Sequence, residues 1–190
     1  ETLINALNQE AQLNPGGDHF HEARLLGLVR NRKALEDWTL QHPEIAEEKL
    51  LAPIIIIGLP RTGTTLLHRT IATDRSLMAP LWYEVRQPAP LDTNFVSDDA
   101  RIAIAAAEVD AMLTAMTGLA AIHPIDAVAP DEEIMLLEHS FMSTVPECYA
   151  CIPEYGDALY SQDPSASYDT LYKMLQFLQW QKRQQGNPGR

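Results

Sequence analysis

The stretch that decides the fold is Pro53-Ile-Ile-Ile-Ile-Gly-Leu-Pro-Arg-Thr-Gly-Thr-Thr65. Its first half is short, β-branched and apolar on both faces, which is typical of a strand buried in a parallel sheet. Its second half places Gly58 and Gly63 ahead of a helical segment that runs from Leu66 to about Thr73. A glycine-rich turn between a buried strand and a helix brings backbone N–H groups to an anion at the helix N-terminus. The stretch therefore predicts a phosphate-binding loop in an α/β fold.

The positively charged residue of this loop stands at a different position from the lysine of nucleotide hydrolases. Gly58 and Gly63 fit the pattern G-x-x-x-x-G-K-[ST], but Thr64 stands in place of the lysine that reaches the β- and γ-phosphates. Arg61 supplies a positive charge inside the loop, and no apolar strand ending in Asp follows to hold magnesium. We therefore expect a phosphate-bearing ligand, but not metal-assisted triphosphate chemistry, and assign no metal ligands.

The rest of the chain is predominantly helical in its pattern. Apolar residues recur at helical spacing in six segments, near 3–11, 20–40, 66–73, 98–118, 130–142 and 167–185. Prolines at positions 80, 88 and 90 predict a long irregular loop over 78–97, and such loops are usually functional.

Only one segment, 53–58, reads with confidence as a strand, and a parallel strand cannot satisfy its backbone groups alone. We therefore expect residues 1–190 to be a single, truncated domain whose sheet is completed elsewhere. Its parts are N-terminal helices (1–52), the strand, loop and helix (53–73), and an acceptor-side loop with further helices (74–190).

Composition narrows the possible partners. The net charge of −12 over 190 residues repels phosphate backbones, so we do not expect a nucleic-acid partner. No charged and apolar leader is seen at the start, and Glu108 and Asp110 interrupt the longest apolar stretch, 102–122. We expect a cytoplasmic protein without a transmembrane segment, able to form homo-oligomers.

The two cysteines, Cys148 and Cys151, have no second pair of metal ligands in the sequence, so we expect them to be buried thiols.

Residues 60–65, Pro-Arg-Thr-Gly-Thr-Thr, following the isoleucine run, resemble the 5′-phosphosulfate loop of PAPS-dependent sulfotransferases. Further segments resemble the large bacterial-type branch of that family, namely 79–84, 99–101, 122–124, 130–133 with 141–143, and 172–180. Two positions depart from it, because Tyr83 separates Trp82 from Glu84 and Ala100 replaces an expected proline.

The resemblance implies a P-loop-type open parallel sheet flanked by helices, with an added helical layer. It also implies transfer of a sulfuryl group from PAPS to a hydroxyl or amine of a small-molecule acceptor, leaving 3′,5′-ADP and using no metal. In the family, a strand with a lysine and a segment with arginine and serine that hold the 3′-phosphate follow the region corresponding to Trp180. We therefore expect these segments beyond Arg190.

Sulfuryl transfer needs hydrogen-bond donors for the anionic oxygens and a cation on the leaving phosphate. Arg61 can supply the cation and bind two oxygens at once. Backbone amides and hydroxyls of the loop can supply the donors. The predicted cofactor-binding residues are Pro60, Arg61, Thr62, Gly63, Thr64 and Thr65.

The reaction also needs a base for the acceptor proton. Four side chains are candidates, and helical periodicity does not choose among Glu84, His123, Glu132 and Glu133. Glu84, within the proline-rich loop, resembles the glutamate that follows the first helix in related tyrosylprotein and carbohydrate sulfotransferases. His123 titrates near neutral pH without tuning. Two other functions stay open: a P-loop nucleotide kinase, and a non-catalytic nucleotide-binding module.

Overall fold

The computed structural model describes residues 1–59, 61–91, 98–186 and 189, and this part of the chain is helical. The α-helices are α1 (Thr2–Gln9), α2 (Pro15–Gln41), α3 (Thr64–Ile71), α4 (Trp82–Arg86), α5 (Asp99–Ala115), α6 (Leu119–Ile122), α7 (Ile134–Leu137), α8 (Pro153–Tyr160) and α9 (Ser165–Gln184). The 3₁₀ helices are η1 (Pro43–Glu47), η2 (Glu138–Ser140) and η3 (Val145–Cys148).

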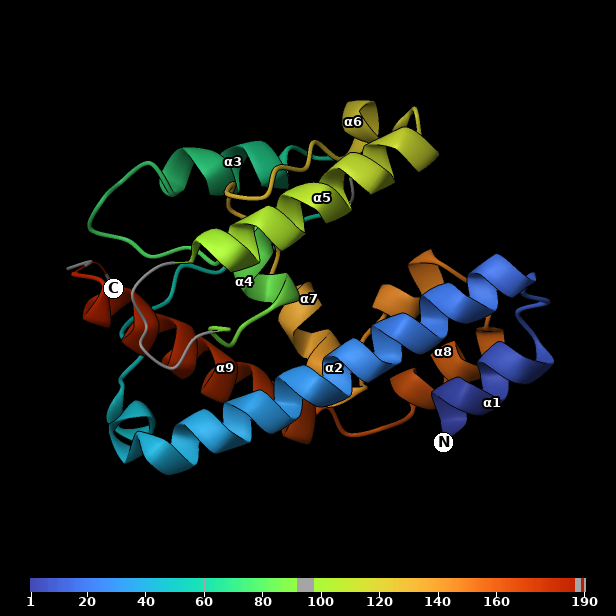
Figure 1. Cartoon of the computed structure of the whole chain (residues 1–190), viewed down its shortest axis with the longest axis horizontal. Helices are drawn as coiled ribbons and strands as arrows, with labels where there is room; N and C mark the ends of the chain where they lie inside the picture. The colour runs from blue at the N-terminus through green and yellow to red at the C-terminus, as the bar shows by residue number, and fades with distance from the viewer. Residues whose placement is uncertain (60, 92–97, 187–188, 190) are drawn as a thin grey trace.

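The helices form two groups, and two short helices lie between them (Figure 1). The long helices α2 and α9 cross in the lower group, where α1 packs against α8. The upper group holds α3, α5 and α6. Helices α4 and α7 lie between the groups and contact each other. The two short central helices therefore connect the upper group to the lower one.

The main core forms where α4, α5, α7 and α9 meet. Val85, Leu136 and Met174 are fully buried there, each on a different helix. Burying a side chain of this size contributes about 1.5–3 kcal/mol. A second cluster around Trp38, Phe177 and Trp180 fastens α2 to α9. The position of α4 is thus fixed by apolar packing from several sides.

The structure confirms the helices expected near residues 3–11, 20–40, 66–73, 98–118 and 167–185. Helix α2 begins earlier than predicted, because Asn14 and Pro15 form a helix start. The Asn14 side chain accepts a hydrogen bond from the Gly17 N–H at 2.9 Å, and Pro15 occupies the first helical position. Both are preferred residues at those positions.

Two other predictions were less accurate. The helix expected over 130–142 is replaced by the short α7 and η2, because Pro130 forms an isolated antiparallel bridge with Leu81. The predicted loop over 78–97 contains the five-residue helix α4, while its part at 92–97 lies outside the described residues.

The strand expected at 53–58 is not formed within the described residues. The segment lacks regular secondary structure, and Ile54, Ile55 and Ile57 are 58%, 72% and 92% exposed instead of buried. The reason is physical: a strand needs a neighbour for its backbone hydrogen bonds, and the described part of the chain contains no ladder beyond the Leu81–Pro130 bridge.

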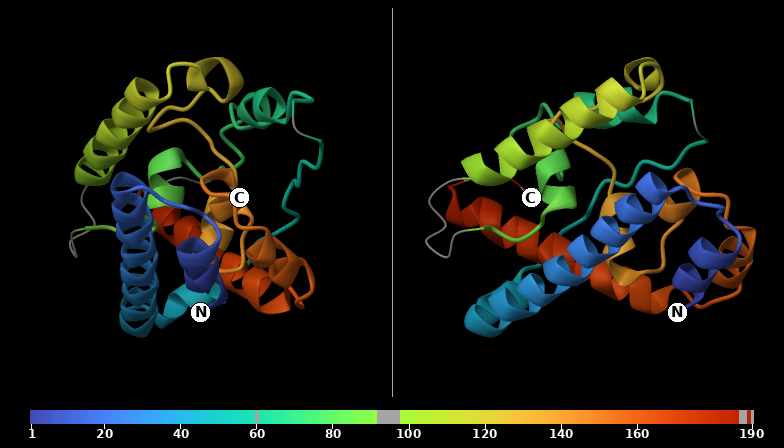
Figure 2. Two further views of the ribbon diagram at one scale, coloured as in Figure 1. Left: turned by 90° about the vertical axis from the view of Figure 1, so that its right-hand side faces the viewer. Right: turned by 45° about the vertical axis from the view of Figure 1, so that its right-hand side comes forward.

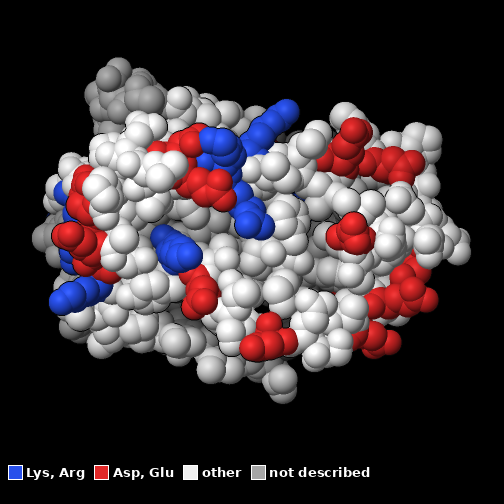
Figure 3. Space-filling view, turned by 90° about the horizontal axis from the view of Figure 1, so that it is seen from below, with Lys and Arg blue, Asp and Glu red and all other residues white. Residues whose placement is uncertain are grey.

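The distribution of charge is uneven on the face seen in Figure 3. Acidic side chains gather at the end of the molecule where α1 and α8 lie, and basic side chains lie among acidic ones at the other end. This face therefore offers no continuous basic stripe for a phosphate backbone.

None of the described helices is long and apolar enough to cross a membrane.

Candidate active site

The loop between the isoleucine run and α3 has a left-handed backbone at two described residues. Gly63 has φ of 90° and Arg61 has φ of 69°, which is the left-handed region. A Cβ on Gly58 would lie 2.8 Å from Cγ2 of Thr64, so this glycine is required by close approach. The hydroxyl of Thr62 donates to the carbonyl oxygen of Leu59 at 2.6 Å. The turn leads directly into α3, whose first N–H groups have no partner within the helix.

The segment 122–131 lies beside this loop. The Arg61 guanidinium donates to the carbonyl oxygen of Ile122. Arg69, one turn into α3, donates to the carbonyl oxygens of Pro124 at 2.6 Å and Pro130 at 3.4 Å. Figure 2 shows the segment running between α3 and α5. The predicted loop residue Pro60 lies outside the described residues.

His123 is thereby placed next to the loop, one residue after the carbonyl that Arg61 contacts. Its side chain is 34% exposed, and its Nε2 lies 3.8 Å from Oδ2 of the buried Asp131. The Asp131 carboxylate raises the pKa of His123, partial burial opposes this, and Glu132 adds a smaller increase. Asp131 is held in turn, because its Oδ1 accepts the Glu132 N–H at 2.8 Å. The pair forms a histidine–carboxylate arrangement with an accessible ring.

Glu84 has a different environment. It is the third residue of α4 and only 3% exposed. Its Oε2 accepts the N–H of Leu81 at 2.7 Å, which caps the helix start, and its Oε1 lies 2.6 Å from Nζ of Lys182 on α9. Both carboxylate oxygens are therefore engaged inside the protein.

Backbone hydrogen bonds join α4 to the segment 122–131. The N–H of Trp82 donates to the carbonyl of Ala129 at 3.0 Å, and that of Tyr83 to the carbonyl of Ala127 at 3.1 Å. The Asp131 N–H donates back to the carbonyl of Pro80 at 3.0 Å. The segment 122–131, which includes His123, therefore contacts both the loop and the helix that carries Glu84.

The remaining predicted side chains lie at the surface. Glu132 and Glu133 are exposed immediately before α7. Cys148 and Cys151 are free and exposed, so the expectation of buried thiols is wrong. They flank the turn between η3 and α8, where the chain follows the surface.

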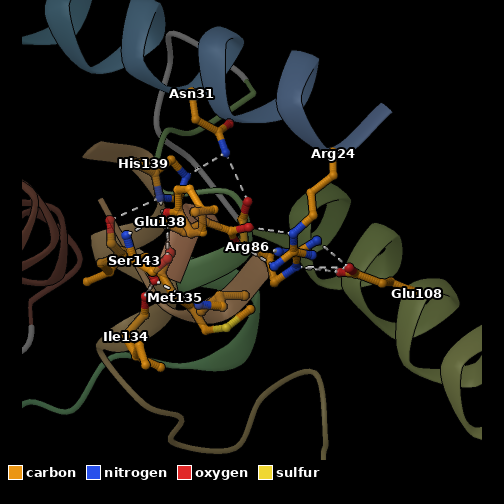
Figure 4. A network of polar contacts seen from close by, with 12 residues as sticks. Arg24, Asn31, Arg86, Glu108, Ile134, Met135, Glu138, His139 and Ser143 are labelled. Carbon is orange, nitrogen blue, oxygen red and sulfur yellow. Dashed lines mark hydrogen bonds and ion pairs between the residues drawn. The ribbon is translucent and has the colours of Figure 1, made fainter. Parts of the chain in front are cut away.

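A network of buried and half-buried ionic side chains joins α4 to its neighbours (Figure 4). Arg24 of α2 binds both oxygens of Glu138 at 2.5 and 2.6 Å, and Arg86 of α4 binds Glu108 of α5 at 2.6 Å. Arg86 also lies 4.0 Å from Glu138. The side chains of Arg24 and Glu138 are 6% and 3% exposed. Buried charges are tolerated only with such partners.

His139 completes this network as a neutral residue. Asn31 bridges its Nε2 and the carbonyl oxygen of Arg86, both at 3.0 Å. Burial lowers the pKa of His139 to about 4, and the nearby Arg86 and Arg24 act in the same direction. His139 is therefore a structural residue and not a candidate base.

Sequence reasoning missed three residues of this region: Arg69, Asp131 and Lys182. Asp131 was included only in the expected helix over 130–142 and in the family-like segment 130–133, with no role of its own. Arg69 was included only in the helical segment 66–73. Lys182 had no signal, because it lies 98 positions from its partner Glu84 and only the packing of α9 brings them together.

The sequence pattern of the sulfotransferase family matches residues 53–177, so the chain belongs to the sulfotransferase family. The fold is similar to crystal structures of sulfotransferase STF1 from Mycobacterium tuberculosis H37Rv, with TM-score 0.77 and 28% identity over 92% of this chain, and of STF9 from Mycobacterium avium, with TM-score 0.77 and 24% identity over 98% of it. This chain covers 48% and 47% of those two chains, about half their length. A search of curated protein sequences gave no match.

Proposed function

We propose that this chain carries the 5′-phosphosulfate site of a PAPS-dependent sulfotransferase and supplies the base for sulfuryl transfer. The observation that supports the proposal is the contact between the Arg61 guanidinium and the carbonyl oxygen of Ile122, the residue before His123. An anion held at the start of α3 would then lie near both a fixed cation and an ionisable ring. Isoleucines 54–57 are proposed to join a parallel sheet formed with strands outside the described residues.

In the proposed reaction, a lone pair of the acceptor oxygen or nitrogen forms a bond to sulfur. The bond between sulfur and the bridging oxygen of the 5′-phosphate breaks, and its electron pair stays on the phosphate. Arg61 and the N–H groups at Thr64 and Thr65 stabilise that charge. His123 accepts the acceptor proton, and Asp131 stabilises the imidazolium that results.

His123 is the preferred base because its ring is accessible, whereas Glu84 has both oxygens engaged. Glu84 remains the alternative base. If Glu84 is not the base, its position at the start of α4 assigns it to holding the segment 127–131, through the hydrogen bonds of Trp82 and Tyr83.

The test is sulfate transfer from labelled PAPS to a cell extract and then to a purified acceptor, using the protein at its natural full length. We expect His123→Gln to lower turnover about a hundredfold or more, the usual scale for loss of a general base, without weakening PAPS binding. Since Asp131 raises the pKa of His123, wild-type activity should rise with pH around a midpoint above 6.5, and Asp131→Asn should lower that midpoint.

Glu84→Gln separates the two candidate bases. If His123 is the base, this variant loses turnover, but its activity still rises with pH through one titration, because the titrating group is still present. Loss of the titration in Glu84→Gln, with normal turnover in His123→Gln, would contradict the assignment.

A further inference from the structure

Lys182 is the only charged partner that the described residues offer to the buried Glu84 carboxylate. The two side chains are 10% and 3% exposed, and their charged atoms lie 2.6 Å apart. A buried carboxylate that loses its cation is strongly disfavoured as an anion. The Lys182 ammonium and the Leu81 N–H each contact one oxygen of the Glu84 carboxylate, so together they hold it between α9 and the start of α4.

That hydrogen bond fixes the start of α4, which is the part that meets the segment 122–131. Leu81 forms the bridge with Pro130, and the next residue, Trp82, donates to the carbonyl of Ala129. A change in the direction of α4 would therefore move the chain around Pro130. Asp131 is the next residue in that chain and contacts His123.

We propose that Lys182 is a positioning residue that acts through Glu84, Leu81 and Pro130 to hold Asp131 against His123. The pathway consists of one ion pair, one capping hydrogen bond, one backbone bridge and one histidine–carboxylate contact, each between described residues. The catalytic part of this inference rests on the function proposed above. The part that concerns the position of Asp131 beside His123 does not depend on it.

Arg183 offers a matched control. It is the next residue of α9 and has the same charge, but it pairs with Glu48, and its side chain is 43% exposed. Loss of Arg183 removes a positive charge from the same helix turn without affecting Glu84. The pair of variants Lys182→Gln and Arg183→Gln therefore distinguishes the contact to Glu84 from a general loss of charge.

The first measurement follows the titration of His123 by NMR in the protein at its natural full length, with His123→Gln used to assign the signal. The charged groups that act on this ring are Asp131 and Glu132, and Arg69 from α3. In Lys182→Gln, Asp131 should move away, so the pKa of His123 should fall toward its ordinary value of 6.5; in Arg183→Gln it should not change. An unchanged titration in Lys182→Gln would overturn the proposal, whatever reaction the protein catalyses.

The second measurement is steady-state sulfate transfer. Misplacement of a catalytic group by about 1 Å can lower the rate up to about a hundredfold. We expect Lys182→Gln to lose at least about tenfold in kcat, with KM for PAPS within about twofold, and Arg183→Gln to be near wild type. Equal kcat in the two variants would also overturn the proposal.

The proposal stays testable if Lys182→Gln does not fold. Glu84→Gln keeps an oxygen for the Leu81 N–H but ends the ion pair, and it should change the His123 titration in the same direction. If wild type transfers no sulfate while both variants shift the His123 titration, the proposed function fails and the positioning role stands.

Discussion

Around Arg86, charged side chains from α2, α4, α5 and η2 are paired and are buried or half-buried (Figure 4). Ahead of α3, in contrast, Ile54, Ile55 and Ile57 are exposed and Arg61 lies at the surface. Both regions contact α4 or the segment that α4 holds. The difference shows that ion pairs fix the helices around Arg86, whereas the described residues leave the loop side exposed.

The largest expected effect comes from breaking the network. Glu138→Gln leaves the buried Arg24 without its bidentate partner, and loss of one partner of a buried pair costs about 3–5 kcal/mol. The free energy of unfolding, measured by urea titration, should fall by this amount. Asp37→Asn is the control: it breaks the exposed pair between Lys33 and Asp37, which contributes about 0–1 kcal/mol. Equal losses in the two variants would show that the Arg24–Glu138 pair is not structurally important.

A second effect of the network is a dependence on acid. Between pH 6.5 and about 4 the unfolded chain protonates His139, whereas the folded chain keeps it neutral. Stability should therefore fall as the pH is lowered through this range, by up to about 3 kcal/mol. Urea unfolding at pH 7 and pH 4.5 measures the loss, which should be smaller in His139→Gln and unchanged in the exposed control His19→Gln. If His139→Gln lost as much unfolding free energy between pH 7 and pH 4.5 as the wild type, a buried neutral His139 would be contradicted.

The smallest effect concerns the loop. Gly63→Ala forces a side chain into φ of 90°, which costs about 1–3 kcal/mol. Gly27→Ala, inside α2 with open space around its Cβ, should instead stabilise by about 0.5–1 kcal/mol. Thermal melts of the two variants should shift in opposite directions. A stabilised Gly63→Ala would mean that the turn does not have the left-handed backbone described.

Helical periodicity was sufficient to predict α5 and α9, because apolar residues recur at helical spacing along both, although α9 buries every residue from Gln176 to Lys182. The short helix α4 has no periodicity of its own and depends on Leu81 bridging Pro130. Local spacing predicted the loop and Arg61, since the glycines define the turn. The contact of Asp131 with His123, and that of Lys182 with Glu84, could not be predicted because each depends on how distant segments pack.

The central claim, that the loop binds a 5′-phosphosulfate and not a magnesium triphosphate, is tested most directly by the melting temperature with each nucleotide. In the protein at its natural full length, 3′,5′-ADP should raise the melting temperature, whereas ATP with magnesium should not. Arg61→Ala should fold normally and lose most of this shift, because a hydrogen bond to a charged group contributes about 1.5–3 kcal/mol. A larger shift with ATP and magnesium, or an undiminished shift with 3′,5′-ADP in Arg61→Ala, would contradict the account.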